Sequence, residues 1–280
     1  MKETNNKATT ITIDKLTPFE GHPFKVLDNE EMNELAKSIQ TLGILDPLIV
    51  RPIENTQDRY EIISGHRRYR AALKAGITQI PALIIPMSRD EAAIALVDSN
   101  LHRDHILPSE RAFSYKLKLE ALKHQGTSVQ LGPKLTASTI EEGKSASQVK
   151  RYIRLTNLIP EILDMVDSGK IALTPAVEIS YLSNEEQEVL LDVMDFEDCT
   201  PSLSQAVKLK KLSQSQELTK DGIFDIMSQL KANQKEKIKI PTERVRKFFP
   251  KNYTALQMEE EIIKMCESRY RKRQRNRDER

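Results

Sequence analysis

Short β-branched runs and amphipathic stretches alternate along the first 87 residues. Apolar runs bounded by proline, glycine or polar turns predict strands, and apolar residues recurring every three or four positions predict a helix that ends at Gly43. Asp28 followed by Glu31 is typical of a capping box at the start of that helix. The predicted strands are residues 8–13, 47–50, 60–63 and 81–85. The pattern therefore predicts a small α/β unit.

A strand, a turn and a second helix are predicted across residues 62–76. Gly65 permits a tight turn, and the helix formers after it end at Gly76. The cationic residues crowded at the helix N-terminus are Arg67, Arg68 and Arg70. Cations there oppose the helix dipole, so an anionic partner such as phosphate is indicated. The alternative is that these arginines face water or pair with acids such as Glu30 and Glu31.

From residue 89 onward, helical periodicity replaces the strand signals. Helices are predicted at residues 91–100 and from Pro108, and a loop rich in Gly, Ser and Thr at residues 126–138. A later stretch, residues 145–158, combines an apolar face with polar and basic residues suited to base edges and phosphates. Its predicted DNA-facing residues are Ser145, Ser147, Gln148, Lys150, Arg151 and Arg154. An ordinary solvated basic helix is the alternative.

The C-terminal third is predicted to be helical. Residues 201–218 are rich in Lys, Gln and Ser and indicate a connector, and a small unit follows Asp221. From Arg269 the chain is strongly basic, which indicates either a disordered solubilising end or a salt-sensitive contact with nucleic acid.

Composition limits these possibilities. The chain has 280 residues with 39% hydrophobic content, enough for several small cores, and its net charge of +2 means that any nucleic-acid surface must come from local clustering. Cys199 and Cys266 lack metal-ligand spacing, which argues against a metal or disulfide framework and suits a reducing cytosol. No apolar run approaches the roughly 20 residues of a membrane span. We therefore expect a cytoplasmic protein without a membrane partner.

Several motifs, in this order and spacing, resemble those of ParB-type partition proteins. They are ELAKSI at residues 34–39, GILDPLIV at 43–50, SGHRRYRAA at 64–72, NLHR at 100–103 and PSERA at 108–112. Residues 144–158 resemble the helix-turn-helix of the same family. The resemblance covers about residues 10–195, and the layout is similar to that of small ParB-like proteins of conjugative elements and plasmids.

The resemblance implies an α+β fold in three parts. These are a small ParB/sulfiredoxin-like α/β domain at residues 1–88, an all-α helix-turn-helix domain at 89–200, and a helical connector, small unit and basic tail at 201–280. It also implies a nucleoid-associated homodimer that binds a centromere-like site on double-stranded DNA. CTP with Mg²⁺ would switch it, and a ParA-type ATPase would be its partner in segregating a chromosome, plasmid or conjugative element.

The resemblance also implies a nucleotide site. Its residues would be Gly65, His66, Arg67, Arg68, Asn100 and Arg103, with Asn100 on the Mg²⁺. The family usually has Glu at the positions of His66 and Ser99 and Arg at the position of Phe24. The resemblance therefore implies that this chain binds nucleotide but does not imply that it hydrolyses it.

Two other classes of function stay open. One is a nucleotide-dependent enzyme, a CTPase or kinase, built on the same N-terminal fold; the other is an adaptor whose basic tail makes every nucleic-acid contact. Sulfiredoxin-like chemistry is excluded, because Gly65 occupies the position of its catalytic cysteine.

Overall fold

The structure is a computed structural model that describes residues 8–103, 105–124, 145–228, 242–250 and 252–278. The chain divides into two compact units, Met1–Gln229 and Leu230–Arg280. The predicted loop at 126–138 lies outside the described residues.

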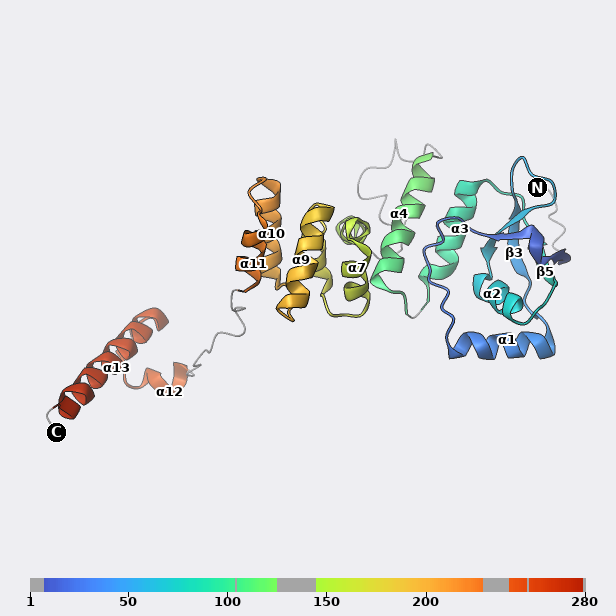
Figure 1. Ribbon diagram of the computed structural model, residues 1–280. Coiled ribbons are helices and arrows are strands. Elements are labelled where there is room, and N and C mark those ends of the chain that lie inside the picture. Colours follow the sequence, from blue (N-terminus) through green and yellow to red (C-terminus); the bar gives the residue numbers. More distant parts are fainter. Residues whose placement is uncertain (1–7, 104, 125–144, 229–241, 251, 279–280) are drawn as a thin grey trace. The chain divides into compact units, whose positions relative to one another are not determined.

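The first unit begins with a mixed five-stranded sheet (Figure 1). Its strands are β1 (Thr9–Thr12), β2 (Leu16–Pro18), β3 (Leu48–Pro52), β4 (Tyr60–Ser64) and β5 (Gln79–Ile84), in the order β1-β5-β3-β4-β2. β1 is antiparallel to β5 and β3 to β4, whereas β3 runs parallel to β5 and β2 to β4. The four predicted strands are confirmed. β2 was not predicted, because three residues ending in proline carry too little alternation.

Two helices accompany the sheet: α1 (Glu30–Leu42) and α2 (His66–Lys74). They share with it a core that includes Met32, Leu48 and Ile62, each fully buried. The predicted cap of α1 was wrong: the Asn29 side chain, not Asp28, accepts the Met32 N–H at 3.1 Å. Asp28 instead pairs with α2, which explains the difference, because Arg70 donates to it at 2.6 Å.

The next layer consists of α3 (Arg89–Leu101) and α4 (Pro108–His124), and both confirm predicted helices. α3 starts with a capping box in which the Ser88 side chain accepts the Glu91 N–H at 3.2 Å. α3 packs against α4 and β4 through a second core that contains Leu96 and Tyr115. This layer is therefore in direct contact with the end of the sheet from which α2 starts.

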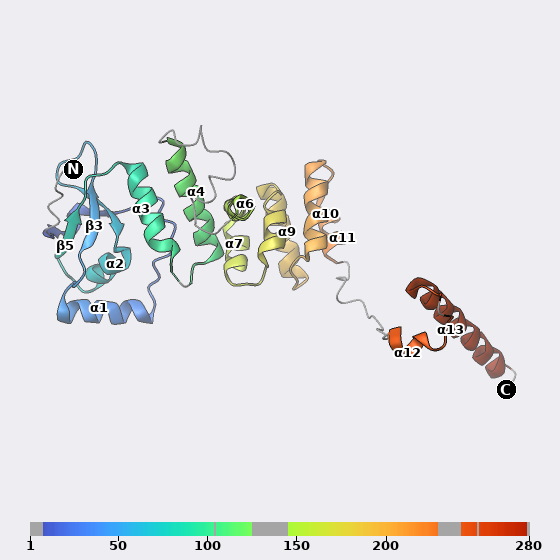
Figure 2. The same cartoon turned by 180° about the vertical axis from the view of Figure 1, so that it is seen from behind.

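The remaining helices of this unit follow in order, and those after Arg154 share a third core (Figures 1 and 2), whereas Val149 before them belongs to the second core. These helices are α6 (Ala146–Arg154), a 3-10 helix (Leu155–Asn157), α7 (Pro160–Asp167), α8 (Leu173–Ile179), α9 (Asn184–Phe196), α10 (Leu203–Gln214) and α11 (Lys220–Met227). The residues predicted as a connector form α10, whose Ala206 and Leu209 are fully buried in this core. α10 packs against α8 and α11, because its apolar residues face them.

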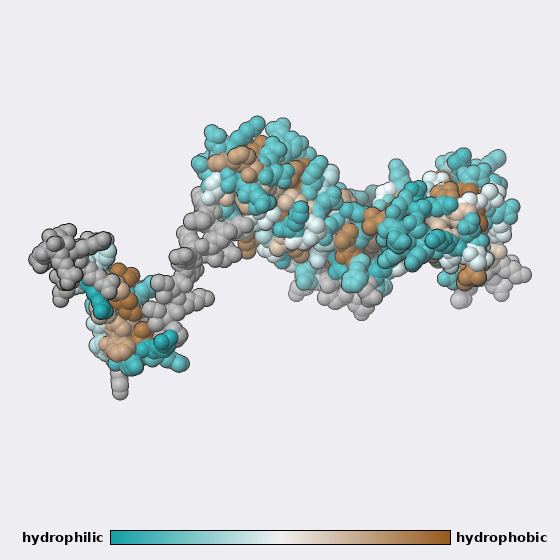
Figure 3. Space-filling model, turned by 60° about the horizontal axis from the view of Figure 1, so that its bottom comes forward, coloured by the Kyte–Doolittle hydropathy of each residue, from teal (hydrophilic) through white to brown (hydrophobic). Residues whose placement is uncertain are grey.

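The second unit holds α12 (Thr242–Arg246) and α13 (Ala255–Asp278). Arg246 Nη1 donates to the Tyr253 carbonyl at 2.6 Å, and Met258 is buried where the two helices meet. Hydrophobic (brown) atoms are visible on this unit in Figure 3, and the exposed apolar residues of α13 include Leu256, Ile263 and Met265. The predicted basic stretch from Arg269 continues α13 to Asp278.

The predicted α+β class is confirmed, with a sheet and two helices followed by helical layers. In the part of the chain that the structure describes, none of the helices is both long and apolar enough to cross a bilayer.

Candidate functional site

The turn between β4 and α2 requires glycine. Gly65 has φ +102°, a conformation that L side chains rarely adopt. A Cβ there would lie 2.9 Å from Leu48 Cγ, so both the backbone and the packing exclude a side chain. Gly65 offers no side-chain cap, and the first turn of α2, which is fully described, contains no acidic residue. The N–H groups of this helix start are thus left for an external anion.

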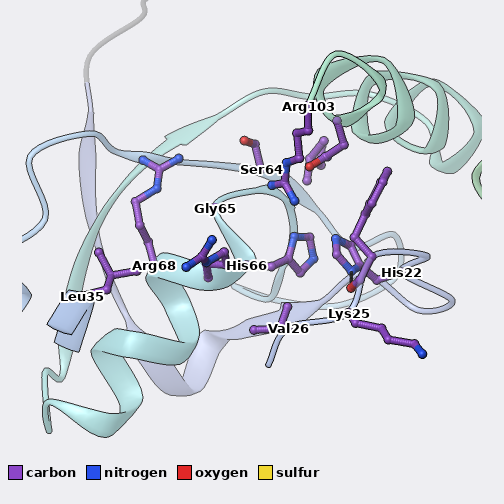
Figure 4. A pocket seen from close by; sticks show the side chains of 13 residues that line it. His22, Lys25, Val26, Leu35, Ser64, Gly65, His66, Arg68 and Arg103 are labelled. Atoms are coloured by element: carbon purple, nitrogen blue, oxygen red, sulfur yellow. Dashed lines mark hydrogen bonds between the residues drawn. The ribbon is translucent and has the colours of Figure 1, made fainter. Parts of the chain in front are cut away.

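A cavity of about 260 Å³ opens beside this turn (Figure 4). The structure brings all six residues of the implied nucleotide site to its wall: Gly65, His66, Arg67, Arg68, Asn100 and Arg103. The rest of the lining comes from Leu35, from Ile63 and Ser64 at the end of β4, and from the segment between β2 and α1, which contributes His22, Phe24, Lys25 and Val26. His22 and Lys25 were not predicted to lie at this site, because the segment that contains them has no periodicity from which to place it.

The arginines of α2 differ in their partners. Arg68 donates through Nη1 to the carbonyl oxygens of Asp46 and Pro47, the latter at 3.1 Å, so its guanidinium is positioned by backbone rather than by an acid. Arg67 pairs with Glu31 at 3.1 Å, but these side chains are 47% and 70% exposed, so the pair is easily exchanged for another anion. Pairing with acids therefore accounts for Arg67, and for Arg70 through Asp28, but not for Arg68.

The opposite wall is formed by the end of α3. Asn100 is 7% exposed, and its amide nitrogen donates to the Leu96 carbonyl at 2.7 Å, which fixes the side chain on the helix. Arg103 follows, with its guanidinium carbon 5.5 Å from the centre of the Phe24 ring, a cation–π distance. Burial lowers the pKa of Arg103, an effect opposed by Glu110, but a guanidinium stays charged at neutral pH.

Two histidines form a further part of the wall. His66 Nε2 accepts the Phe19 N–H at 3.2 Å, and the ring lies beside that of His22 in Figure 4. Burial, with smaller effects from His22 and Arg103, lowers the pKa of His66 to about 3. Burial also lowers the pKa of His22, whose Nδ1 donates to the Phe24 carbonyl at 2.8 Å. His66 is therefore neutral at physiological pH and carries its proton on Nδ1.

Lys25 connects the cavity wall to the helical layers. Its N–H donates to Glu110 of α4 at 2.8 Å. Its ammonium group extends away from Arg68 and Arg103 in Figure 4 and pairs with Asp164 and Asp167 of α7 at 3.0 and 3.2 Å. Asp167 also accepts from the N–H of Ser109 at 2.9 Å. The segment that walls the cavity is thus fixed to both α4 and α7.

The predicted DNA-facing helix is α6, and it begins where the sequence predicts. The Ser145 side chain accepts the Gln148 N–H at 3.2 Å, and the Gln148 side chain accepts the Ser145 N–H at 3.2 Å. Both residues therefore form a capping box. Val149 is buried on the inner face, whereas Ser147 and Lys150 are exposed.

The two arginines of α6 contact α8. Arg151 donates to Thr174 Oγ1 at 2.7 Å. Arg154 donates to the Ser180 carbonyl at 2.9 Å, and its guanidinium carbon lies 3.8 Å from the centre of the Tyr181 ring. Its Nε is buried and has no hydrogen-bond partner among the described residues. Arg154 therefore helps to pack α6 against the C-terminal end of α8, a role that the sequence did not predict.

Comparison with known proteins agrees with this architecture. Residues 1–101 match the family model of the ParB N-terminal domain. A nucleoid occlusion protein of Bacillus mycoides is 31% identical over 230 residues, which are 79% of this chain and 76% of that protein. A probable chromosome-partitioning protein ParB of Coxiella burnetii is 30% identical over 197 residues, 69% of this chain and 63% of that protein.

The C-terminally truncated chromosome-partitioning protein ParB from Caulobacter crescentus, complexed to the centromeric parS site, is 24% identical, with a TM-score of 0.40, and covers 74% of this chain and 99% of that one. This chain spans less than two thirds of the Coxiella relative but about three quarters of the Bacillus one. On the identity and coverage of these relatives, the chain belongs to the ParB family of partition proteins.

Proposed function

We propose that this chain is a sequence-specific DNA-binding protein that acts at the nucleoid in segregation or in its regulation. It binds a centromere-like site as a homodimer through α6 and holds a nucleoside triphosphate, CTP, in the cavity beside α2. The nucleoid occlusion and chromosome-partitioning roles named for its relatives support the DNA half. The observation that carries the nucleotide half is the gathering of Gly65, Arg67, Arg68 and Arg103 around one cavity.

The chemistry of the cavity favours a polyphosphate. Guanidinium groups bind phosphate through parallel N–H donors, and the start of α2 adds backbone N–H groups and the positive end of a helix dipole. Mg²⁺, implied by the resemblance, fits the donor set poorly, because none of the described lining residues is a carboxylate.

The chemistry of α6 favours DNA. Ser147 and Lys150 are exposed on the outer face, with Arg151 beside them. The capping box and the contact of Arg154 with Tyr181 fix the helix so that this face can be presented rigidly. In this proposal Lys150 and Arg151 contact phosphates or base edges, and Arg154 holds the helix in place.

The proposed nucleotide-binding and DNA-binding parts of the chain are separated where the strands end and the helices begin, at α3. Residues 1–88 carry most of the cavity, and the helical layers from residue 89 carry the DNA-facing helix. Because α10 and α11 share the core of α8 and α9, we place residues 203–227 with those layers. A ParA-type ATPase partner is part of the proposal through the family alone.

The DNA half is tested by selecting duplexes from a random pool and measuring their affinity for the full chain as a function of salt. Enrichment of a palindromic sequence and a steep loss of affinity with rising salt are expected.

The proposed nucleotide binding is tested by equilibrium binding of labelled CTP, ATP and GTP to wild type and Arg68→Ala. Tightest binding of CTP and its loss in the variant are expected; no enrichment, or no binding of any nucleotide, contradicts the corresponding half.

An enzyme on this fold is not favoured by the site. His66 Nε2 is already bound by the Phe19 N–H, and no carboxylate among the described lining residues could activate water. We therefore propose binding without turnover, which the absence of released phosphate over hours in the presence of bound CTP would support.

A further inference from the structure

The charged groups that face the cavity are all positive. Its described lining residues include the cationic Arg67, Arg68 and Arg103 and no acid, and the ammonium group of Lys25 pairs outside the cavity with Asp164 and Asp167. The side-chain oxygens that line it are those of Ser64 and Asn100, and both are neutral. Mg²⁺ beside a nucleotide is usually held by one or two carboxylates together with the phosphates, so this set of donors is unusual for a metal-assisted site.

Of the nearby carboxylates, the exposed Glu31 pairs with Arg67, and the buried Glu110 and Asp167 are engaged by backbone N–H groups and Lys25. Glu110 uses one oxygen for the Lys25 N–H and the other for the Leu107 N–H, at 2.8 and 3.1 Å, and is 9% exposed. Turning it toward the cavity would leave two N–H groups without acceptors, which is costly in a buried position. Asp167 is likewise occupied by Lys25 and Ser109. Across the residues that the structure describes, no cluster of three His, Cys, Asp or Glu residues could hold a metal ion.

His66 adds a donor where a metal site would need an acceptor. Because its Nε2 accepts from Phe19, the proton of the neutral ring is on Nδ1. Within the described residues, the structure shows no acceptor for this N–H, and the ring lines the cavity. An imidazole in this state can donate to a phosphate oxygen but has no lone pair left for a cation.

We propose that the cavity takes its polyphosphate as the free anion, without a divalent cation, and that the His66 Nδ1–H is one of the donors to it. The inference rests on the proposed nucleotide binding. The arginines, the start of α2 and this N–H supply the positive field that a metal ion supplies elsewhere.

The test measures binding of CTP and of inorganic triphosphate to the full chain by calorimetry, once with excess EDTA and once with excess Mg²⁺, at matched ionic strength. Affinity in EDTA is expected to equal or exceed that in Mg²⁺. A loss of affinity in EDTA beyond the roughly twofold error of such a measurement overturns the inference while leaving nucleotide binding intact. No binding of either ligand in either buffer overturns the proposed nucleotide binding as well.

Substitutions at His66 test the donor itself. His66→Gln keeps an acceptor for the Phe19 N–H and an N–H to donate, so metal-free binding is expected to stay within about threefold of wild type. His66→Glu adds a negative charge to the wall and is expected to weaken metal-free binding about tenfold or more, with partial recovery in Mg²⁺. Equal metal-free affinity of His66→Glu and wild type overturns the role of this donor. Lys15→Gln, which removes an exposed positive charge outside the lining, is the control.

Discussion

The imidazole rings of His22 and His66 lie with their centroids 3.8 Å apart and their planes inclined by 35°. The first ring is fixed by the Phe24 carbonyl and the second by the Phe19 N–H, both in the segment that follows β2. Two protonated rings at this distance would repel each other in a partly buried site. Protonation of the two rings in acid is therefore expected to destabilise the native state.

Mild acid is expected to destabilise the protein through His66. Its pKa is lowered from 6.5 to about 3, so below pH 6.5 the unfolded chain takes up a proton that the native chain does not bind until about pH 3. The free energy of unfolding should fall across this window by at most about 1.4 kcal/mol per pH unit. Urea denaturation at several pH values measures this slope.

His66→Gln, which cannot titrate, should flatten the pH dependence. The control is His124→Gln, which removes a ring that is 71% exposed and lies outside the cavity lining. Equal slopes for wild type and His66→Gln would refute the assignment.

Gly65→Ala is expected to cost about 1–3 kcal/mol of stability and to abolish nucleotide binding. The alanine must adopt φ +102°, and its Cβ meets Leu48. Gly76→Ala is the matched control, since Gly76 also has positive φ but open space around it. Chemical denaturation should show the larger loss at Gly65; equal losses would mean that the contact with Leu48 has no effect.

The buried pair between Arg51 and Glu61 joins β3 to β4 directly before the turn. Arg51 Nε lies 2.7 Å from Glu61 Oε2, and the two side chains are 6% and 9% exposed. Removing one partner leaves a buried charge, so Arg51→Met or Glu61→Leu alone should cost about 3–5 kcal/mol.

The double variant Arg51→Met/Glu61→Leu should recover much of this loss, because neither charge remains. A thermodynamic cycle of the four proteins measures the coupling. Additive effects of the two substitutions would show that the pair is not coupled.

Lys150→Ala is expected to affect DNA binding alone, whereas Arg154→Ala is expected to affect stability as well. Lys150 is exposed, so its loss should weaken DNA binding and reduce the salt dependence by about one ion without changing stability. Arg154→Ala removes the contacts with Ser180 and Tyr181 and should also lower stability, by about 1–2 kcal/mol. Thermal denaturation separates the two; equal stability of both variants would argue against the packing role of Arg154.

Sequence periodicity was sufficient for most of the fold and for one wall of the cavity. The strand before Gly65 and the helix after it follow from local preferences, and α3 and α4 follow from apolar spacing and from Pro108. The cap of α1 was misplaced by one residue, because Asp28 and Asn29 are both good caps and only the tertiary pairing of Asp28 with Arg70 decides between them.

The part of the cavity wall between β2 and α1 could not be predicted, because its position depends on long-range packing. His22 and Lys25 lie in an aperiodic segment, and their position at the cavity depends on contacts with His66, Glu110 and Asp167 that are distant in sequence. The direction of Arg154 likewise depends on where α8 places Tyr181. Local pattern contains no information about such contacts.

The attachment of Lys25 to α7 has a consequence for genetics. Asp167 lies outside the lining of the cavity, yet it holds the residue that continues the cavity wall. A screen for variants that no longer retain nucleotide should therefore return substitutions in α7 together with those in α2. Mapped on the linear sequence, such variants would form two separate groups, although one structural connection explains both.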